Sequence, residues 1–181
     1  MKAFHADAKI KSKYLKRVED HQKADEIIHG TYWQDGKGCA VGCTIEGDQH
    51  QRYETELGIP ESIARLEDFL FEGMKNGEAK TFPARFLKAV PVGADLSLVP
   101  AKFILFVLND VANVKEAKAD ANVLAAIENI ADLWQRVING KVVKDEEWSA
   151  ARSAARSAAW SAACKKYADY LLTLLKESPT K

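Results

Sequence analysis

The sequence has few cysteines, no excess of either charge and no long hydrophobic run. Only three of its 181 residues are cysteines, an odd and low number that argues against a disulfide scaffold and favours a reducing cytoplasm. Lysine and arginine total 26, as do aspartate and glutamate. This balance argues against a basic domain that binds nucleic acid by neutralising phosphates, and against an acidic DNA mimic. We therefore expect a cytoplasmic protein for which nucleic acid is not the partner.

The longest apolar stretch, residues 96–108, is too short to cross a membrane. It contains Ser97, Pro100 and Lys102, whereas a spanning helix needs about 20 apolar residues. The first seven residues lack the apolar core and cleavage site of an export signal. The sequence therefore predicts neither a membrane span nor export.

What the sequence does contain is a helical period along most of its length. Apolar residues recur every three or four positions from Asp7 to His29, and again in the stretches 60–75, 83–90 and 117–139, as amphipathic helices require. The run Phe103 to Leu108 is apolar on every side, and we expect it to form a buried central helix. The pattern predicts an all-α fold of six to eight helices.

The length predicts one compact domain over residues 1–181, because folding at this size buries roughly 70% of the extended-chain surface. Residues 1–140 would form the body, and residues 141–181 a long alanine-rich helix packed on it, capped by Asp145. The sequence pattern does not assign a secondary structure to residues 31–46. The turn-rich segment 34–38 and the apolar segment 39–45 fit a small hairpin and a glycine-weakened helical turn equally well.

Residues 148–163 repeat every four residues. Each block is one large residue followed by Ser-Ala-Ala, and the blocks begin at Trp148, Arg152, Arg156 and Trp160. In an α-helix each block drifts by about 40°, so the large side chains spiral slowly around the axis. One interpretation is a thin helix laid against the body. The other is an exposed ridge that docks a protein, because tryptophan and arginine dominate interface hot spots, and these four residues are the predicted partner-binding site.

Two cysteines and two histidines lie close together in the sequence. Cys39 and Cys43 are four positions apart, His29 lies ten residues before Cys39, and His50 lies seven after Cys43. Two thiolates and two imidazoles can complete a tetrahedral zinc site. Buried thiols that pack as small hydrophobes and a thiol nucleophile with a base in reach are the other interpretations.

No catalytic motif is recognisable. Gly36, Gly38 and Gly42 match neither the Walker pattern nor a dinucleotide-binding loop. The adjacent acids Glu67 and Asp68 are expected on a polar helix face, where they predict no acid–base chemistry. The sequence therefore favours a protein without enzymatic activity and without a cofactor.

Four segments resemble a group of small proteins encoded by bacteriophages and prophages of Gram-negative bacteria, often with an alanine-rich tail. The segments are 36–43, 53–60, 66–73 and 90–97, and the resemblance covers about residues 1–100 and, loosely, the tail. It transfers no activity, cofactor or catalytic residue. It implies a setting in which small accessory proteins bind a host protein and act as inhibitors or adaptors. Inhibitors of bacterial defence nucleases, such as anti-CRISPR proteins, belong to this category.

Together these observations lead us to expect a cytoplasmic, non-enzymatic protein-binding module of phage or prophage type. Its partner would be a host or defence protein, and a homodimer is compatible with the sequence. The second hypothesis is a small metal- or thiol-dependent enzyme that uses the Cys39–Cys43 segment, with zinc held by Cys39, Cys43, His29 and His50.

Overall fold

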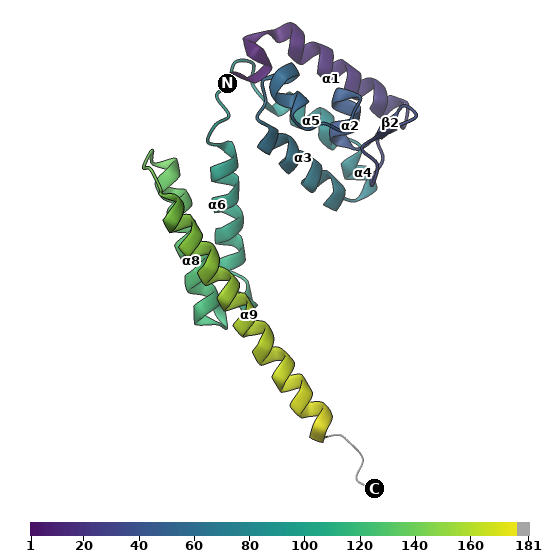
Figure 1. The fold of residues 1–181 in the computed structure, drawn as a ribbon. Coiled ribbons are helices and arrows are strands. Elements are labelled where there is room, and N and C mark those ends of the chain that lie inside the picture. Colours follow the sequence, from purple (N-terminus) through teal and green to yellow (C-terminus); the bar gives the residue numbers. More distant parts are fainter. Residues whose placement is uncertain (177–181) are drawn as a thin grey trace. The chain divides into compact units, whose positions relative to one another are not determined.

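The protein is described here by a computed structural model that covers the backbone of residues 1–176 and, apart from Asn76, the side chains of residues 1–160. Over that range the chain forms nine α-helices and one two-stranded sheet (Figure 1), which confirms the all-α prediction. The chain divides into two compact units, residues 1–100 and residues 101–181. Whether the chain behaves as one domain stays a prediction, and each unit is described by itself.

The first unit is built around one short, fully buried helix. All six residues of α2 (Ala40–Ile45) are buried, and α2 contacts α1, α3 and α5. A 3-10 turn (Ala3–Ala6) opens the unit, and a π-helical turn (Tyr53–Leu57) precedes α3. The other helices are α1 (Ala8–Lys23), α3 (Glu61–Gly73), α4 (Asn76–Ala79) and α5 (Phe82–Ala89).

Helix α1 begins as its sequence predicts but ends early. Asp7 caps it by accepting a hydrogen bond from the Lys9 amide at 2.8 Å. The helix stops at Lys23 instead of reaching His29, because Asp25 takes a left-handed conformation with φ of 58°. The following residues run beside Gly38, so Ile27 is buried through a strand-like bridge. Ile28, the last residue of the predicted helical period, therefore lies outside the helix.

The segment 31–46 contains both structures that its sequence allowed. Strands β1 (Trp33–Gln34) and β2 (Lys37–Gly38) form an antiparallel hairpin, and α2 follows directly. Asp35 and Gly36 have φ of 51° and 81°, the two positive values that a tight hairpin turn of this kind requires.

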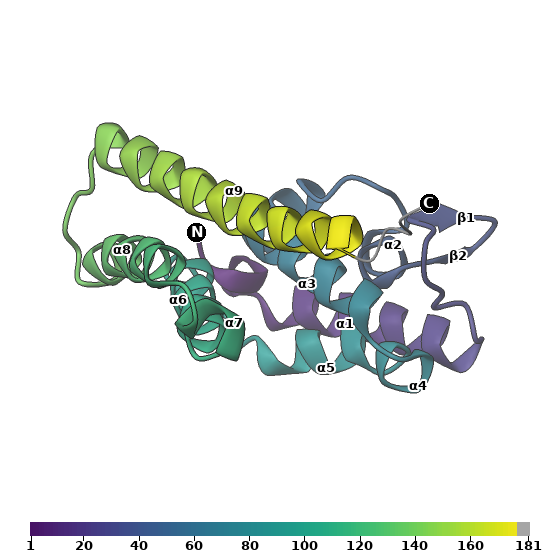
Figure 2. The same ribbon diagram turned by 90° about the horizontal axis from the view of Figure 1, so that it is seen from below.

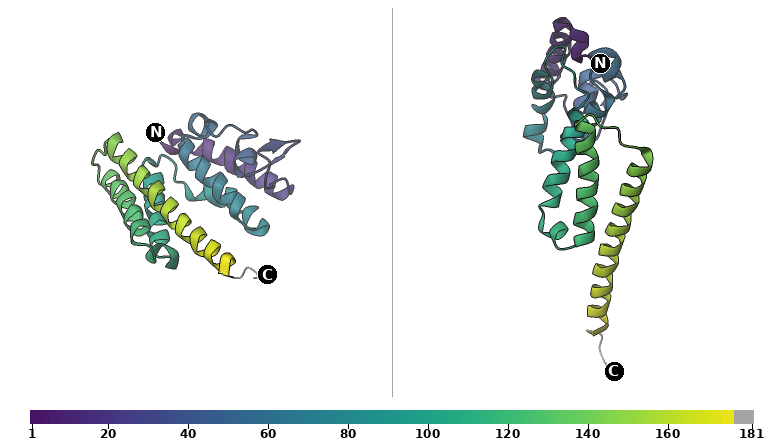
Figure 3. Two further views of the ribbon diagram at one scale, coloured as in Figure 1. Left: turned by 60° about the horizontal axis from the view of Figure 1, so that its bottom comes forward. Right: turned by 90° about the vertical axis from the view of Figure 1, so that its left-hand side faces the viewer.

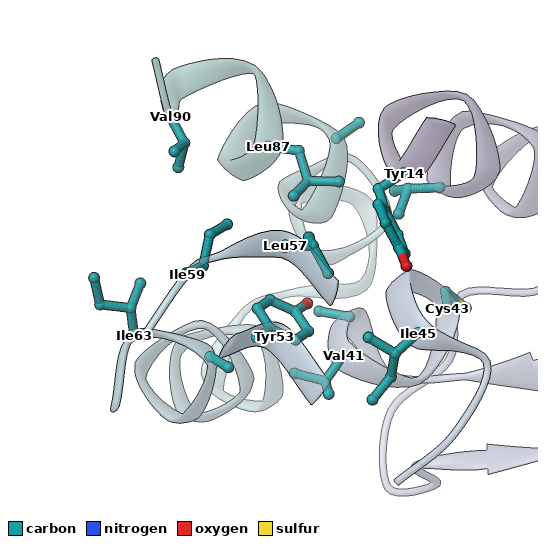
Figure 4. Packing of buried hydrophobic residues seen from close by; sticks show 14 of the residues in the cluster. Tyr14, Val41, Cys43, Ile45, Tyr53, Leu57, Ile59, Ile63, Leu87 and Val90 are labelled. Atoms are coloured by element: carbon teal, nitrogen blue, oxygen red, sulfur yellow. The ribbon is translucent and has the colours of Figure 1, made fainter. Parts of the chain in front are cut away.

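The core of the first unit gathers around the π-helical turn. Figure 4 shows Val41, Ile45 and Leu57 clustered about the ring of Tyr53. The Tyr53 hydroxyl donates a 2.8 Å hydrogen bond to Glu67 Oε2. Glu67 is only 1% exposed, which corrects its expected place on a polar face, and burial raises its pKa to about 8.

The second unit consists of two long helices and two further elements. Helix α8 (Ala121–Ile138) is capped by Asp120, whose carboxylate accepts from the Asn122 and Val123 amides. Helix α9 (Asp145–Lys176) packs antiparallel to α8 (Figure 2), and Asp145 is its first helical residue instead of the predicted cap. Because α9 has 32 residues and α8 has 18, α9 continues past the end of α8 (Figure 3). The short helix α7 (Lys115–Lys118) leads into α8.

Helix α6 (Val99–Ala112) corrects the expectation of a buried central helix. The segment is helical, but Ala101 is its one buried residue. Phe106 is 67% exposed, and Val107 and Val111 are also exposed. Apolar composition indicates burial only where a second element covers the helix, and the buried central position belongs to α2. Within residues 1–176, none of the helices is both long and apolar enough to cross a membrane.

Candidate functional sites

The repeat helix uses its small residues to approach α8. The Trp148 ring packs on the Trp134 ring of α8, with 4.8 Å between their centroids. Ala151 is 1% exposed and Ala158 9%. These positions, three and ten residues after Trp148, follow the helical period, so they mark the face of α9 turned to α8.

The other large residues of the repeat lie away from that contact. Arg152 and Arg156 are exposed, and Trp160 is 70% exposed. The structure therefore separates the four predicted partner-binding residues: Trp148 anchors the helix, while Arg152, Arg156 and Trp160 form what we call the α9 ridge. The side chains of residues 161–163, the rest of the last repeat, lie outside the described residues.

The four predicted zinc ligands do not form one cluster. The Cys43 thiol is fully buried and donates to the Gly38 carbonyl at 3.3 Å. The His29 ring donates through Nε2 to the Phe71 carbonyl at 3.1 Å. Both side chains therefore make contacts typical of structural residues.

Cys39 has other neighbours. It caps α2, where its Sγ accepts from the Gly42 amide at 3.4 Å. Its sulfur and one carboxylate oxygen each of Asp68 and Glu72 lie within 4.8 Å of one another. We call Cys39, Asp68 and Glu72 the thiol–carboxylate cluster. Among the described residues it is the single group of three or more metal-ligating side chains this close together.

Two more side chains surround the cluster. His50 is 7% exposed and donates through Nε2 to Asp68 Oδ2 at 3.2 Å. The Tyr32 ring meets the His50 ring edge-on at 5.5 Å. A pocket of about 200 Å³ opens beside them, lined by Gly30, Thr31, Tyr32, Asp68 and Glu72. Of the four predicted ligands, Cys39 and His50 thus both lie next to Asp68.

Burial and the Asp68 carboxylate together determine the pKa values of this region. Burial raises the pKa of Cys39 to about 12, and the Asp68 charge adds to the rise. The same carboxylate raises the pKa of Tyr32. Burial raises the pKa of Cys43 to about 12 as well. Both thiols therefore keep their protons at neutral pH, which gives a thiolate nucleophile no support.

Sequence reasoning missed Asp68 and Glu72. They stand four residues apart on α3, a spacing that places two carboxylates on one helix face, and that spacing was the available signal. The sequence contained nothing to show that this face meets Cys39, because the contact depends on how α3 packs against α2.

Comparisons of the chain with protein-family models, with curated proteins and with solved structures gave no match. Function is therefore inferred from the residues themselves.

Proposed function

We propose that the protein is a non-enzymatic protein-binding module whose α9 ridge docks an acidic surface of a host or defence protein. The observation that carries the proposal is the ridge itself, in which an indole 70% exposed stands next to two exposed guanidinium groups. Tryptophan and arginine are the residue types most enriched among interface hot spots.

The packing of α9 supports this assignment. Trp148, Ala151 and Ala158 supply the contact with α8, so the structural requirement is met by other residues than those of the ridge. Arg152, Arg156 and Trp160 are then free to serve another purpose. The two positive charges favour a partner with an acidic rim, and the indole favours an apolar pocket inside that rim.

Helix α6 gives a second reason to infer a binding role for this unit. Its exposed Phe106, Val107 and Val111 lie on one helix, and exposed apolar patches often mark interaction surfaces. The phage or prophage setting, and inhibition of a defence protein in the anti-CRISPR manner, rest on the resemblance of residues 1–100 alone.

The proposal is tested by charge reversal. The full-length protein, R152E/R156E and a matched control, K115E/K118E, would each be used to capture partners from a lysate of a Gram-negative bacterium. Lys115 and Lys118 are exposed basic residues in the same unit, so the control makes the same change in net charge. Circular dichroism would verify that all three proteins are equally helical.

The purified partner would then be titrated against each protein. We expect the wild type and K115E/K118E to bind equally, R152E/R156E to lose binding, and Trp160→Ala to bind about 30-fold or more weakly, as expected of a hot spot. Equal loss in the control variant, or full binding by R152E/R156E, would refute the α9 ridge as the interface.

A further inference from the structure

We propose that Cys39, Asp68 and Glu72 bind a divalent transition metal of the zinc class. The ligands come from two places in the chain: Cys39 caps α2, and Asp68 and Glu72 lie one turn apart on α3. Their sulfur and carboxylate oxygens are within 4.8 Å of one another. The inference goes beyond the protein-binding role and does not depend on it.

The spacing is close to that of a zinc site. With Zn–S of about 2.3 Å and Zn–O of about 2.1 Å, tetrahedral ligands lie roughly 3.3–3.7 Å apart. The thiol–carboxylate cluster must therefore contract by about 1 Å. Glu72 is exposed and borders the pocket, where its carboxylate accepts from the Gly30 amide at 3.0 Å. Rotation of this side chain exchanges that surface hydrogen bond for a metal contact and supplies the movement without disturbing the core.

An unpaired oxygen points to the same site. Asp68 Oδ1 is buried and has no hydrogen-bond partner among the described residues, while Oδ2 accepts from His50. A buried carboxylate oxygen without a partner destabilises the fold. A cation coordinated by Oδ1 removes that destabilisation, and His50 holds the carboxylate in place, as outer-shell partners of metal ligands do.

The donor set indicates the class of metal. Two carboxylates beside a thiol concentrate negative charge, which favours a divalent cation. Metal binding releases the Cys39 thiol proton to water, and the thiolate ligand so formed favours zinc and its softer neighbours over magnesium and calcium, which prefer oxygen alone. Three protein ligands leave a fourth position for water, and the pocket of about 200 Å³ lined by Asp68 and Glu72 gives water access to it.

The test uses zinc chloride and the full-length protein after treatment with a chelator. Isothermal titration would compare the wild type with Cys39→Ser, Asp68→Asn and the control Cys43→Ser. Serine is a good helix cap, so Cys39→Ser should preserve α2. The Cys43 thiol is equally buried and lies outside the cluster, so its substitution controls for the loss of a thiol.

We expect one equivalent of zinc to bind to the wild type and to Cys43→Ser. Loss of one ligand should weaken binding at least about 100-fold, since even outer-shell changes cost about 10–100-fold. Cobalt provides a second readout, because a thiolate ligand gives a sulfur-to-cobalt charge-transfer band. That band should persist in Cys43→Ser and disappear in Cys39→Ser.

Two results would overturn the metal site: no zinc binding to the wild type, or equal zinc affinity in the wild type and in folded Cys39→Ser and Asp68→Asn. The protein-binding proposal is tested separately with R152E/R156E, so either proposal can fail while the other stands.

Discussion

At the scale of single residues, the buried pair of Tyr53 and Glu67 shows how the first unit tolerates an acid in its core. Glu67 is 1% exposed, and its one hydrogen bond comes from the Tyr53 hydroxyl. Glu67 Oε1 has no partner among the described side chains. The buried carboxyl group therefore depends on the Tyr53 hydroxyl, because loss of this donor leaves both of its oxygens without a hydrogen bond.

We predict that Tyr53→Phe lowers the free energy of unfolding by about 1–3 kcal/mol, the cost of a buried polar group left without a partner. Tyr14→Phe is the matched control, because the Tyr14 hydroxyl donates to Glu56, which also accepts from Arg52. Tyr14→Phe should therefore cost less, under about 1 kcal/mol. Urea titrations of the two variants check this, and equal losses would contradict the role assigned to Tyr53.

The sequence drew attention to several residues of the candidate site, but it did not predict which of them are neighbours in the structure. Cys39 and His50 were selected from their spacing to Cys43 and His29, yet in the structure they share Asp68 as a neighbour. Glu67 was expected on a polar face because it stands next to another acid. Whether an acid is buried depends on which side of α3 meets α2, and a single sequence with mixed acidic and apolar positions does not determine that side.

At the scale of secondary structure, Gly42 explains how the hairpin and α2 cross. A Cβ atom at Gly42 would lie 1.5 Å from the Tyr32 carbonyl oxygen, and one at Gly38 would lie 2.1 Å from the same atom. The glycines therefore allow the backbone of the hairpin and of α2 to cross closely, which explains why glycines occur in segment 31–46.

We predict that Gly42→Ala lowers the free energy of unfolding by about 3 kcal/mol or more, at the upper end of overpacking costs, since the obstructing atom belongs to the backbone. Gly73→Ala, at the last residue of α3, is the control because no atom lies within 4 Å of its built Cβ. That change should be neutral or slightly stabilising. Thermal unfolding followed by circular dichroism compares the two, and a tolerated Gly42→Ala would contradict the crossing.

Element prediction succeeded where period and caps agreed. Helices α1 and α8 each begin directly after an aspartate cap, and the predicted cap Asp145 is the first residue of α9. It failed for the end of α1, because the period continues to the apolar Ile28 while the helix stops at Lys23. It also failed for the burial of α6, because composition does not say whether a partner surface exists.

At the scale of the whole molecule, the buried core belongs to one part of the chain. The main hydrophobic cluster consists of residues between Ala3 and Leu96, all within the first compact unit. The boundary near Pro100 falls at the start of α6, inside the most apolar stretch of the sequence. No glycine- or serine-rich linker marks this boundary, so the sequence pattern could not predict that the chain divides there.

We predict that a fragment of residues 1–100 folds by itself, because it contains the complete hydrophobic cluster and exceeds the roughly 40 residues below which a domain usually needs disulfides or metals. The urea transition of the fragment should be cooperative. Gly42→Ala should lower its midpoint, as we expect for the full chain. A broad, non-cooperative transition of the fragment would show that its core depends on the remaining residues.

Site-specific photocrosslinking shows directly whether the α9 ridge contacts the partner. A photoreactive phenylalanine analogue would be placed at position 160 and, in a control protein, at the exposed position 118. Bacterial cells that produce each protein would then be irradiated. The account predicts one specific adduct from position 160 that R152E/R156E abolishes, and none from position 118. Adducts of equal yield from both positions, or an adduct that survives R152E/R156E, would contradict it.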